Sequence, residues 1–178
     1  METKVIKSSN KKFLLSIIGS LIFIFLGGWL AINPEKFVSA IFKNTFFMRI
    51  AGIASLLFFG FVLLTIIKKR LSDKNMGIII NELGIIDNSS FVSVGLIKWE
   101  DIISIEKSNV LSTNFLLIKV NNPEHYINIS TGVKSKLLNG NYKSYGTPIS
   151  ISSNFISCSF IQLEDTLLNS FEKYKLNN

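Results

Sequence analysis

Two long stretches without a charged residue lie within the first 70 positions of the chain. Phe13 to Ile32 contains twenty residues, and Ile50 to Ile67 contains eighteen. Twenty residues at a rise of about 1.5 Å give a helix of about 30 Å, the hydrocarbon thickness of a bilayer. The pattern predicts two membrane-spanning helices, at 13–32 and 49–70. The alternative, a buried helix pair in a soluble protein, is disfavoured because two such runs are rare in a soluble chain of 178 residues.

The first stretch resembles a signal peptide in its position near the N-terminus. A signal peptide has an apolar core of roughly 7–15 residues and a small-x-small cleavage site. Phe13 to Ile32 is longer than this, and the sequence from Trp29 to Pro34 offers no such site. We therefore expect a permanent anchor.

The segment between the two stretches, 33–48, begins with a helix-start pattern. Asn33 can cap a helix, Pro34 suits its first position, and Glu35 places an acid in the first turn. Phe37, Ile41 and Phe42 would then share one face. We expect a short helix lying at the outer membrane interface. A lid over a ligand is the less favoured alternative.

Small side chains recur along both apolar stretches, at Ser16, Ser20, Gly27, Ala31, Ala51, Ser55 and Gly60. Small residues let two helices approach closely in a membrane, so we expect a packed hairpin. A homo-oligomer formed through the same stripe is the alternative. Neither stretch has an ionisable residue in its middle, which argues against a proton relay, an ion path or an intramembrane active site.

After residue 74 the pattern changes to that of short β-strands. Ile78 to Ile80 and Ile85 to Ile86 flank Asn81 to Gly84, which predicts a hairpin, and Asp87 to Ser90 predicts the next turn. Further apolar runs or alternating positions predict strands within 92–96, 102–110, 115–120, 149–151 and 155–158.

Two helices are expected in the same region. Val133, Leu137 and Leu138 indicate a short helix ended by Asn139-Gly140. Ser159 and Gln162 have the spacing of a capping box and predict the start of a C-terminal helix. Its apolar stripe consists of Phe160, Leu163, Leu167, Phe171 and Tyr174.

Charge changes the picture by indicating sidedness. Residues 1–74 hold eleven Lys or Arg and three Asp or Glu, a net charge of +8, whereas residues 75–178 carry eight Lys and nine Asp or Glu, a net charge of −1. Nucleic-acid binders carry positive charge on the folded domain, so nucleic acid is disfavoured as a partner. The residues expected to set anchoring and topology are Lys11, Lys12, Arg49, Lys68, Lys69 and Arg70.

The positive-inside rule converts this distribution into a topology. The first twelve residues and the segment after the second stretch carry four Lys or Arg each, against three in the connecting segment. We predict a multi-pass protein with both termini in the cytoplasm. It would have a basic N-terminus at 1–12, an external loop at 33–48 and a cytoplasmic domain at 75–176. The abundance of Asn, Ile, Lys and Ser is typical of AT-rich bacterial genomes, so we expect the bacterial inner (plasma) membrane.

The order of elements predicts a fold class. A helical hairpin is followed by about six or seven antiparallel strands and one amphipathic helix that can cover the open end of the sheet. This is the layout of a pleckstrin-homology-like (PH-like) barrel. The segment Leu96 to Ile105, LIKWEDIISI, resembles the "apolar-x-Trp-x-Asp-Ile" turn of bacterial PH-like domains. With Gly84 to Ser90 and Tyr145 to Ser152, it is similar to a family of small bacterial membrane proteins with two transmembrane helices before a PH-like domain. The resemblance implies fold and location and supplies no catalytic residues.

Few residues carry chemistry. Trp99 and Asp101 are interpreted as structural, with Asp101 capping backbone N–H groups and Trp99 packing on the barrel; a ligand contact is the alternative. His125 is the single histidine and Cys158 the single cysteine, so neither a Cys/His metal cluster nor a disulfide within the chain is expected. We predict no catalytic residue, metal or cofactor. Glu100 and Asp101 are adjacent, so on a strand they would point to opposite faces.

One basic region is a candidate contact surface. Residues 125–163 contain three lysines and no Asp or Glu, and Tyr142 and Tyr145 lie near these lysines. Such a region can touch anionic lipid headgroups or an acidic partner, although an ordinary solvated loop is the favoured interpretation. The candidate contact residues are Lys134, Lys136, Tyr142, Lys143 and Tyr145.

These patterns favour a non-enzymatic, membrane-anchored PH-like module whose partners are the lipid bilayer and a protein. Anchoring raises the local concentration of such a partner, and a sheet edge can receive it by strand addition. The alternative is an accessory or regulatory subunit of a larger membrane complex, assembled through the helical hairpin. An enzyme is the least favoured hypothesis.

Overall fold

The computed structural model describes residues 2–37, 44–72, 77–110 and 112–176. The chain divides into two compact units, one of residues 10–74 and one of residues 1–9 with 75–178. We call the first unit the helical hairpin and the second the sheet domain. The sheet domain is therefore assembled from two segments that lie on either side of the hairpin in the sequence.

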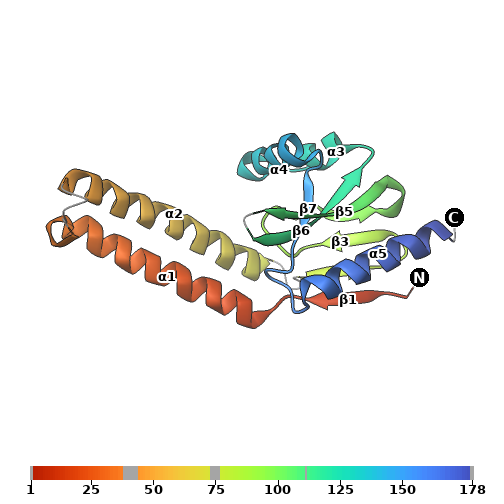
Figure 1. The fold of residues 1–178 in the computed structure, drawn as a ribbon, viewed down its shortest axis with the longest axis horizontal. Helices are drawn as coiled ribbons and strands as arrows, with labels where there is room; N and C mark the ends of the chain where they lie inside the picture. Colours follow the sequence, from red (N-terminus) through yellow and green to blue (C-terminus); the bar gives the residue numbers. More distant parts are fainter. Residues whose placement is uncertain (1, 38–43, 73–76, 111, 177–178) are drawn as a thin grey trace. The chain divides into compact units, whose positions relative to one another are not determined.

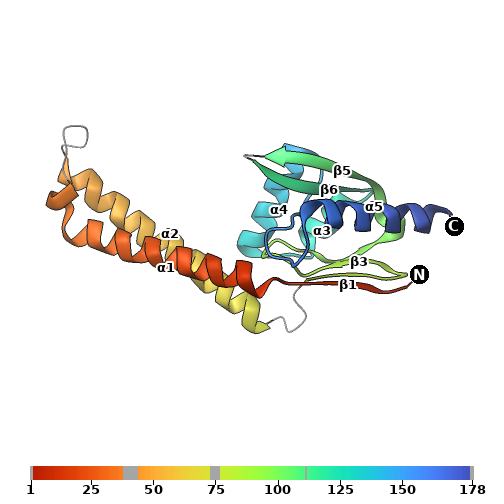
Figure 2. The same ribbon diagram turned by 60° about the horizontal axis from the view of Figure 1, so that its bottom comes forward.

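The helical hairpin consists of α1 (Asn10–Ile32) and α2 (Thr45–Ser72), with the short 3₁₀ helix η1 (Pro34–Phe37) after α1. The two long helices lie side by side in both views (Figures 1 and 2). Both are long and apolar enough to cross a membrane, which confirms the prediction of two long apolar helices. Most of their apolar side chains point away from the hairpin, with only 11% and 6% of the most apolar windows buried.

Small residues bring the two helices together. A Cβ atom added to Gly52 would lie 2.6 Å from the backbone nitrogen of Ala31 and 2.6 Å from the carbonyl oxygen of Gly27. Ser55 Oγ donates a hydrogen bond of 3.2 Å to the carbonyl of Phe23. Close packing through small residues is thus confirmed, but the predicted stripe on the second helix is shifted. Gly52 contacts α1 at the position where the sequence predicted Ala51.

The connecting segment starts as expected. η1 follows Asn33, and the Phe37 ring meets the Trp29 ring edge-on at 6.1 Å. The described helix is a single 3₁₀ turn. Ile41 and Phe42, which were assigned to the same predicted face, lie outside the described residues.

The first sheet contains four antiparallel strands in the order β1-β2-β3-β4 (Figure 1). They are β1 (Lys4–Lys7), β2 (Gly77–Ile80), β3 (Gly84–Asp87) and β4 (Gly95–Lys98). The β2–β3 hairpin is confirmed, and Asn81 Oδ1 accepts hydrogen bonds from the backbone N–H groups of Leu83 and Gly84 in its turn. A Cβ at Gly84 would lie 2.0 Å from the Ile97 carbonyl oxygen, so strand β4 requires glycine there.

The sequence predicts no strand in the basic segment 1–12, where the structure has β1, because two apolar residues between lysines are too few to reveal a strand. A second feature of this sheet contradicts its prediction. Val92 and Val94 were placed on a strand, but they precede it. The chain turns there because Ser93 Oγ accepts a hydrogen bond from the Ser90 N–H, and Gly95, with φ of 79°, then starts β4.

The second sheet contains β5 (Ile102–Val110), β6 (Thr113–Val120) and β7 (Ile149–Ile151), in that order. The 3₁₀ turn η2 (Trp99–Asp101) connects β4 to β5. Leu116, Ile118 and Val120 are buried on one face, as predicted, and Leu117 is buried on the other. Helices cover both faces, with α3 and α4 on one side and α5 on the other (Figure 1).

The sequence predicts an antiparallel barrel or sheet with a C-terminal helix; the antiparallel sheets and the helix are confirmed, but the described strands do not close into a barrel. Within the described residues, the strands form two separate antiparallel sheets of four and three strands. The η2 turn redirects the chain between β4 and β5, so these neighbouring strands belong to different sheets. Phe155 to Cys158, predicted as the last strand, forms only an isolated bridge between Ser8 and Ile156.

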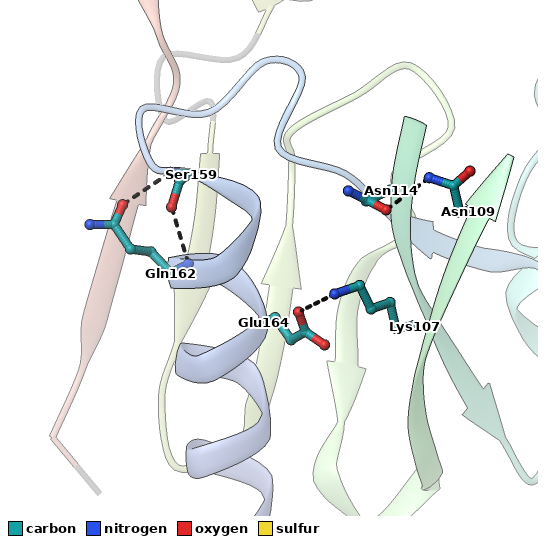
Figure 3. Close-up of polar contacts among 6 residues, drawn as sticks. All are labelled: Lys107, Asn109, Asn114, Ser159, Gln162 and Glu164. Atoms are coloured by element: carbon teal, nitrogen blue, oxygen red, sulfur yellow. Dashed lines mark hydrogen bonds and ion pairs between the residues drawn. The ribbon is translucent and has the colours of Figure 1, made fainter. Parts of the chain in front are cut away.

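Helix α5 (Phe160–Leu176) closes the core of the sheet domain. Its capping box is confirmed: Gln162 N–H donates to Ser159 Oγ at 3.2 Å, and Ser159 N–H donates to Gln162 Oε1 at 3.0 Å (Figure 3). Leu163 and Leu167 are fully buried against both sheets. Lys107 of β5 forms an ion pair of 3.2 Å with Glu164, which ties the helix to the second sheet (Figure 3).

Candidate functional site

A groove with a volume of about 440 Å³ lies between α3 (Pro123–Asn128) and α4 (Gly132–Tyr145). Asn122 starts α3 by accepting the His125 N–H at 3.1 Å, and Pro123 occupies the first turn. The groove is lined by Glu124, Ile127, Asn128, Ser135, Lys136, Asn139 and Tyr142. The groove is open and mixed in charge, which suits a protein surface or a small polar ligand.

Helix α4 differs from its prediction in length. The predicted stop at Asn139-Gly140 is wrong, because the helix continues to Tyr145 and ends at Gly146, with φ of 70°. Leu138 is fully buried and holds this helix to the sheet domain. The space beside Gly140 is open, so glycine there is no barrier to the helix.

The five predicted contact residues all lie on α4, but they divide between its faces. Lys136 and Tyr142 line the groove together. Lys143 is exposed and lies seven residues after Lys136, on the same helical face. Lys134 is half-buried and lies on another face. Tyr145 lines a separate cavity of about 100 Å³ against the second sheet.

A lysine outside the predicted set supports the end of α4. The Lys119 ammonium of β6 donates a hydrogen bond to the carbonyl of Tyr145. A cation at the C-terminal end of a helix satisfies a free carbonyl and opposes the negative end of the helix dipole. Lys119 therefore acts as a structural residue, and its sequence context in a strand gave no sign of this role.

Trp99 is a structural residue, as interpreted from the sequence. Its side chain is 2% exposed, and Nε1 donates a hydrogen bond of 2.8 Å to the Asn81 carbonyl. The indole stacks with the rings of Phe171 and Tyr174, at centroid distances of 6.1 and 5.9 Å. Trp99 thus joins the first sheet to α5.

Asp101 has a different partner from the one predicted. Its Oδ2 accepts a hydrogen bond of 2.7 Å from the Tyr126 hydroxyl, which links the η2 turn to α3. Burial raises the pKa of Tyr126 above its usual value near 10, and the hydrogen bond to Asp101 raises this pKa further. Tyr126 was missed in the sequence because its contact with Asp101 spans 25 positions and two elements, which no local pattern reveals.

A second hollow, of about 240 Å³, lies beside Trp99. It is lined by Glu82, Leu83, Leu96, Lys98, Trp99, Glu100 and Tyr174. Lys98 and Glu100 form an exposed ion pair at 3.1 Å, and this hydrogen bond raises the pKa of Lys98. Exposed pairs of this kind add little stability, so the pair mainly sets the charge of the rim.

His125 and Cys158 lie in different settings. His125 is exposed and packs its ring edge against Tyr126 at 5.2 Å. Cys158 is half-buried and packs against the core of the sheet domain. In the part of the chain that the structure describes, no three His, Cys, Asp or Glu side chains gather as a metal-binding group.

One of the charged residues at the ends of the hairpin connects the two long helices. Arg70, near the end of α2, donates a hydrogen bond to Asn10 Oδ1 at the start of α1, and its guanidinium lies 5.2 Å from the centre of the Phe13 ring. Lys11, Arg49 and Lys68 are exposed. The other two predicted residues, Lys12 and Lys69, are half-buried.

Comparisons with protein-family models, curated proteins and solved structures find no match to this chain.

Proposed function

We propose that this protein is a membrane-anchored, non-enzymatic binding module. The helical hairpin crosses the bacterial inner membrane twice, and the sheet domain recruits a protein partner at the cytoplasmic face. The observation that carries the proposal is the outward-facing apolar surface of both long helices: Leu15, Phe25, Leu57 and Leu64 are each between 67% and 71% exposed. Burying such surface in lipid removes its contact with water.

The sidedness is supported by the strand pairing. β1 precedes α1 in the sequence and β2 follows α2, yet the two strands pair along Lys4–Lys7 and Gly77–Ile80. Both ends of the hairpin must then lie on one side of the membrane, which agrees with two crossings. The Lys and Arg clusters near residues 11 and 69 favour the cytoplasm for that side.

The sheet domain itself supports a PH-like fold. Among the described residues, antiparallel sheets of four and three strands are followed by an amphipathic C-terminal helix that packs on the core, an order of elements that the LIKWEDIISI resemblance also implies. The open arrangement of the two sheets replaces the closed barrel in this proposal. Such a domain presents binding surfaces without needing a catalytic pocket.

The partner-binding surface is the exposed face of α4 together with the α3–α4 groove. Lys136 and Lys143 project from this face, and Glu124 is the one acidic residue among those that line the groove. A protein with an acidic surface is the complementary partner. Tyr142 adds an aromatic contact in the groove, a residue type enriched in protein interfaces.

The experiment is crosslinking in intact cells followed by mass spectrometry of the purified full chain. The double variant Lys136→Glu/Lys143→Glu should lose its crosslinks to a soluble partner, because the charge complementarity is reversed. The control Lys173→Glu/Lys175→Glu makes the same change of charge on α5 and should keep the crosslinks to the soluble partner. Crosslinks that reach only membrane subunits through the hairpin, unchanged by either variant, would instead identify the protein as a subunit of a larger membrane complex.

A further inference from the structure

One exposed face of α4 carries apolar and small side chains. Val133 and Leu137 are 51% and 46% exposed, and Gly140 and Ser144 continue the same face and are exposed too. Successive members of this set are four, three and four positions apart, so all of them lie within about 60° of one another around the helix axis. Helices that pack along each other use this spacing for the positions between them. We call Val133, Leu137, Gly140 and Ser144 the α4 seam.

The other faces of α4 hold it to the sheet domain. Leu138 is fully buried, and Ser135 and Tyr142 line the groove shared with α3. The helix packs against α3 and β7 (Figure 1). The α4 seam lies on the side that these contacts leave uncovered, so its apolar side chains are not needed for the core of the domain.

The described part of the chain gives no reason for glycine at position 140. Gly140 lies inside α4 and its φ is not positive, so the backbone does not require glycine there. A Cβ atom at this position would meet nothing within 4 Å. Glycine is unfavourable inside a helix because it loses more conformational freedom on folding than other residues, and it suits a place where another backbone approaches closely. The α4 seam therefore has room for a second helix at Gly140.

Two lysines lie beside the α4 seam and select the kind of helix that fits it. Lys136 and Lys143 are exposed on one flank, and among the described residues neither ammonium forms an ion pair. α4 has no acidic residue, so pairing two copies of α4 would bring lysine against lysine, which is repulsive. A helix with acidic residues next to its apolar positions would neutralise both lysines. Charge complementarity thus favours a partner protein over a second copy of this chain.

We propose that the α4 seam binds an amphipathic helix of the partner protein. The apolar side chains of that helix pack against Val133 and Leu137, its backbone comes closest at Gly140, and its acidic residues pair with Lys136 and Lys143. The inference rests on the proposed function and specifies the segment of the partner that is bound.

Photocrosslinking in intact cells tests what lies on the α4 seam. The photoreactive amino acid p-benzoylphenylalanine replaces Ser144 in the full chain, and mass spectrometry identifies the segment that it captures after irradiation. We expect a segment of a soluble protein in which apolar residues recur every three or four positions, with Asp or Glu next to them. Capture of lipid, of a second copy of this chain or of a segment without this pattern would overturn the proposal, as would the absence of any crosslink.

A leucine at Gly140 tests the close approach. Gly140→Leu fills the space between the two backbones and should lower the yield of the partner crosslink by about tenfold or more. Leucine is a better helix former than glycine, so the same variant should not lower the thermal midpoint of the chain, which separates lost binding from lost folding. Asn169→Leu, at an exposed position of α5, is the matched control and should keep the yield. An unchanged yield in Gly140→Leu would contradict packing at the α4 seam.

The charge variant separates this inference from the proposed function. If Lys136→Glu/Lys143→Glu loses the soluble partner while Gly140→Leu still crosslinks to it, the partner binds elsewhere on the surface of α4. The proposed function then stands, and the helix on the α4 seam fails. If only membrane subunits are crosslinked, through the hairpin, and neither variant changes the result, the proposed function fails and the inference fails with it.

Discussion

At the residue scale, two aromatic side chains hold the η2 turn between the sheets. Trp99 binds the Asn81 carbonyl and packs on α5, while Tyr126 donates its hydroxyl proton to Asp101. The sequence predicted the first role, because a tryptophan next to a core strand is normally buried. It could not predict the second, because the partners are separated by 25 positions and lie on different elements.

Replacing Tyr126 by Phe should lower the free energy of unfolding of the sheet domain by about 1–3 kcal/mol at neutral pH, because the Asp101 carboxylate loses a buried donor. The pKa of Tyr126 is raised in the folded state, so its contribution is fully present below pH 10, the ordinary tyrosine value, and is lost as the pH rises above it. The wild-type chain should therefore lose stability above pH 10 more steeply than the variant.

The measurement is urea unfolding of the full chain in detergent, monitored by the fluorescence of Trp99 in a Trp29→Phe background. The chain has two tryptophans, so this background leaves Trp99 as the single reporter. Tyr142→Phe, which removes a hydroxyl at the α3–α4 groove, is the control. Parallel pH profiles for wild type and Tyr126→Phe would contradict the assigned role of this hydroxyl.

At the element scale, the elements with strong local signals were predictable. The capping box of α5 needs only two residues at the correct spacing, and both of its hydrogen bonds are present. β1 and the second half of α4 lack such signals. The pairing of β1 with β2 stabilises a strand whose four residues show little pattern, and the packing of Leu138 extends α4 through Asn139-Gly140.

Hairpin packing gives the element-scale prediction. Gly52→Leu should destabilise the packed helices by about 1–3 kcal/mol, because its side chain must displace the backbone of α1. Gly60→Leu is the control, since a Cβ there meets nothing within 4 Å. Thermal unfolding of the helical circular dichroism signal in detergent measures both. Equal midpoints for the two variants would refute the close approach at Gly52.

At the scale of the whole molecule, the order of secondary structure was predictable and the assembly of the sheets was not. Apolar runs near the N-terminus and alternating positions after residue 74 indicated helices followed by antiparallel strands. The division into two sheets depends on η2 and on β1. Strand β1 pairs with β2 in the first sheet, although the whole hairpin separates these two strands in the sequence. Of the candidate contact residues, the groove brings Lys136 and Tyr142 together, because helical geometry turns Lys134 and Tyr145 to another face.

The central claim is that the hairpin crosses the membrane twice with both ends in the cytoplasm. Single cysteines at Thr3→Cys, Glu35→Cys and Leu176→Cys, in the Cys158→Ala background, report the three chain segments. A membrane-impermeant maleimide applied to intact spheroplasts should label Glu35→Cys at once and the other two only after lysis. Labelling of Thr3→Cys or Leu176→Cys from outside, or recovery of the chain in the soluble fraction after alkaline extraction, would contradict the account.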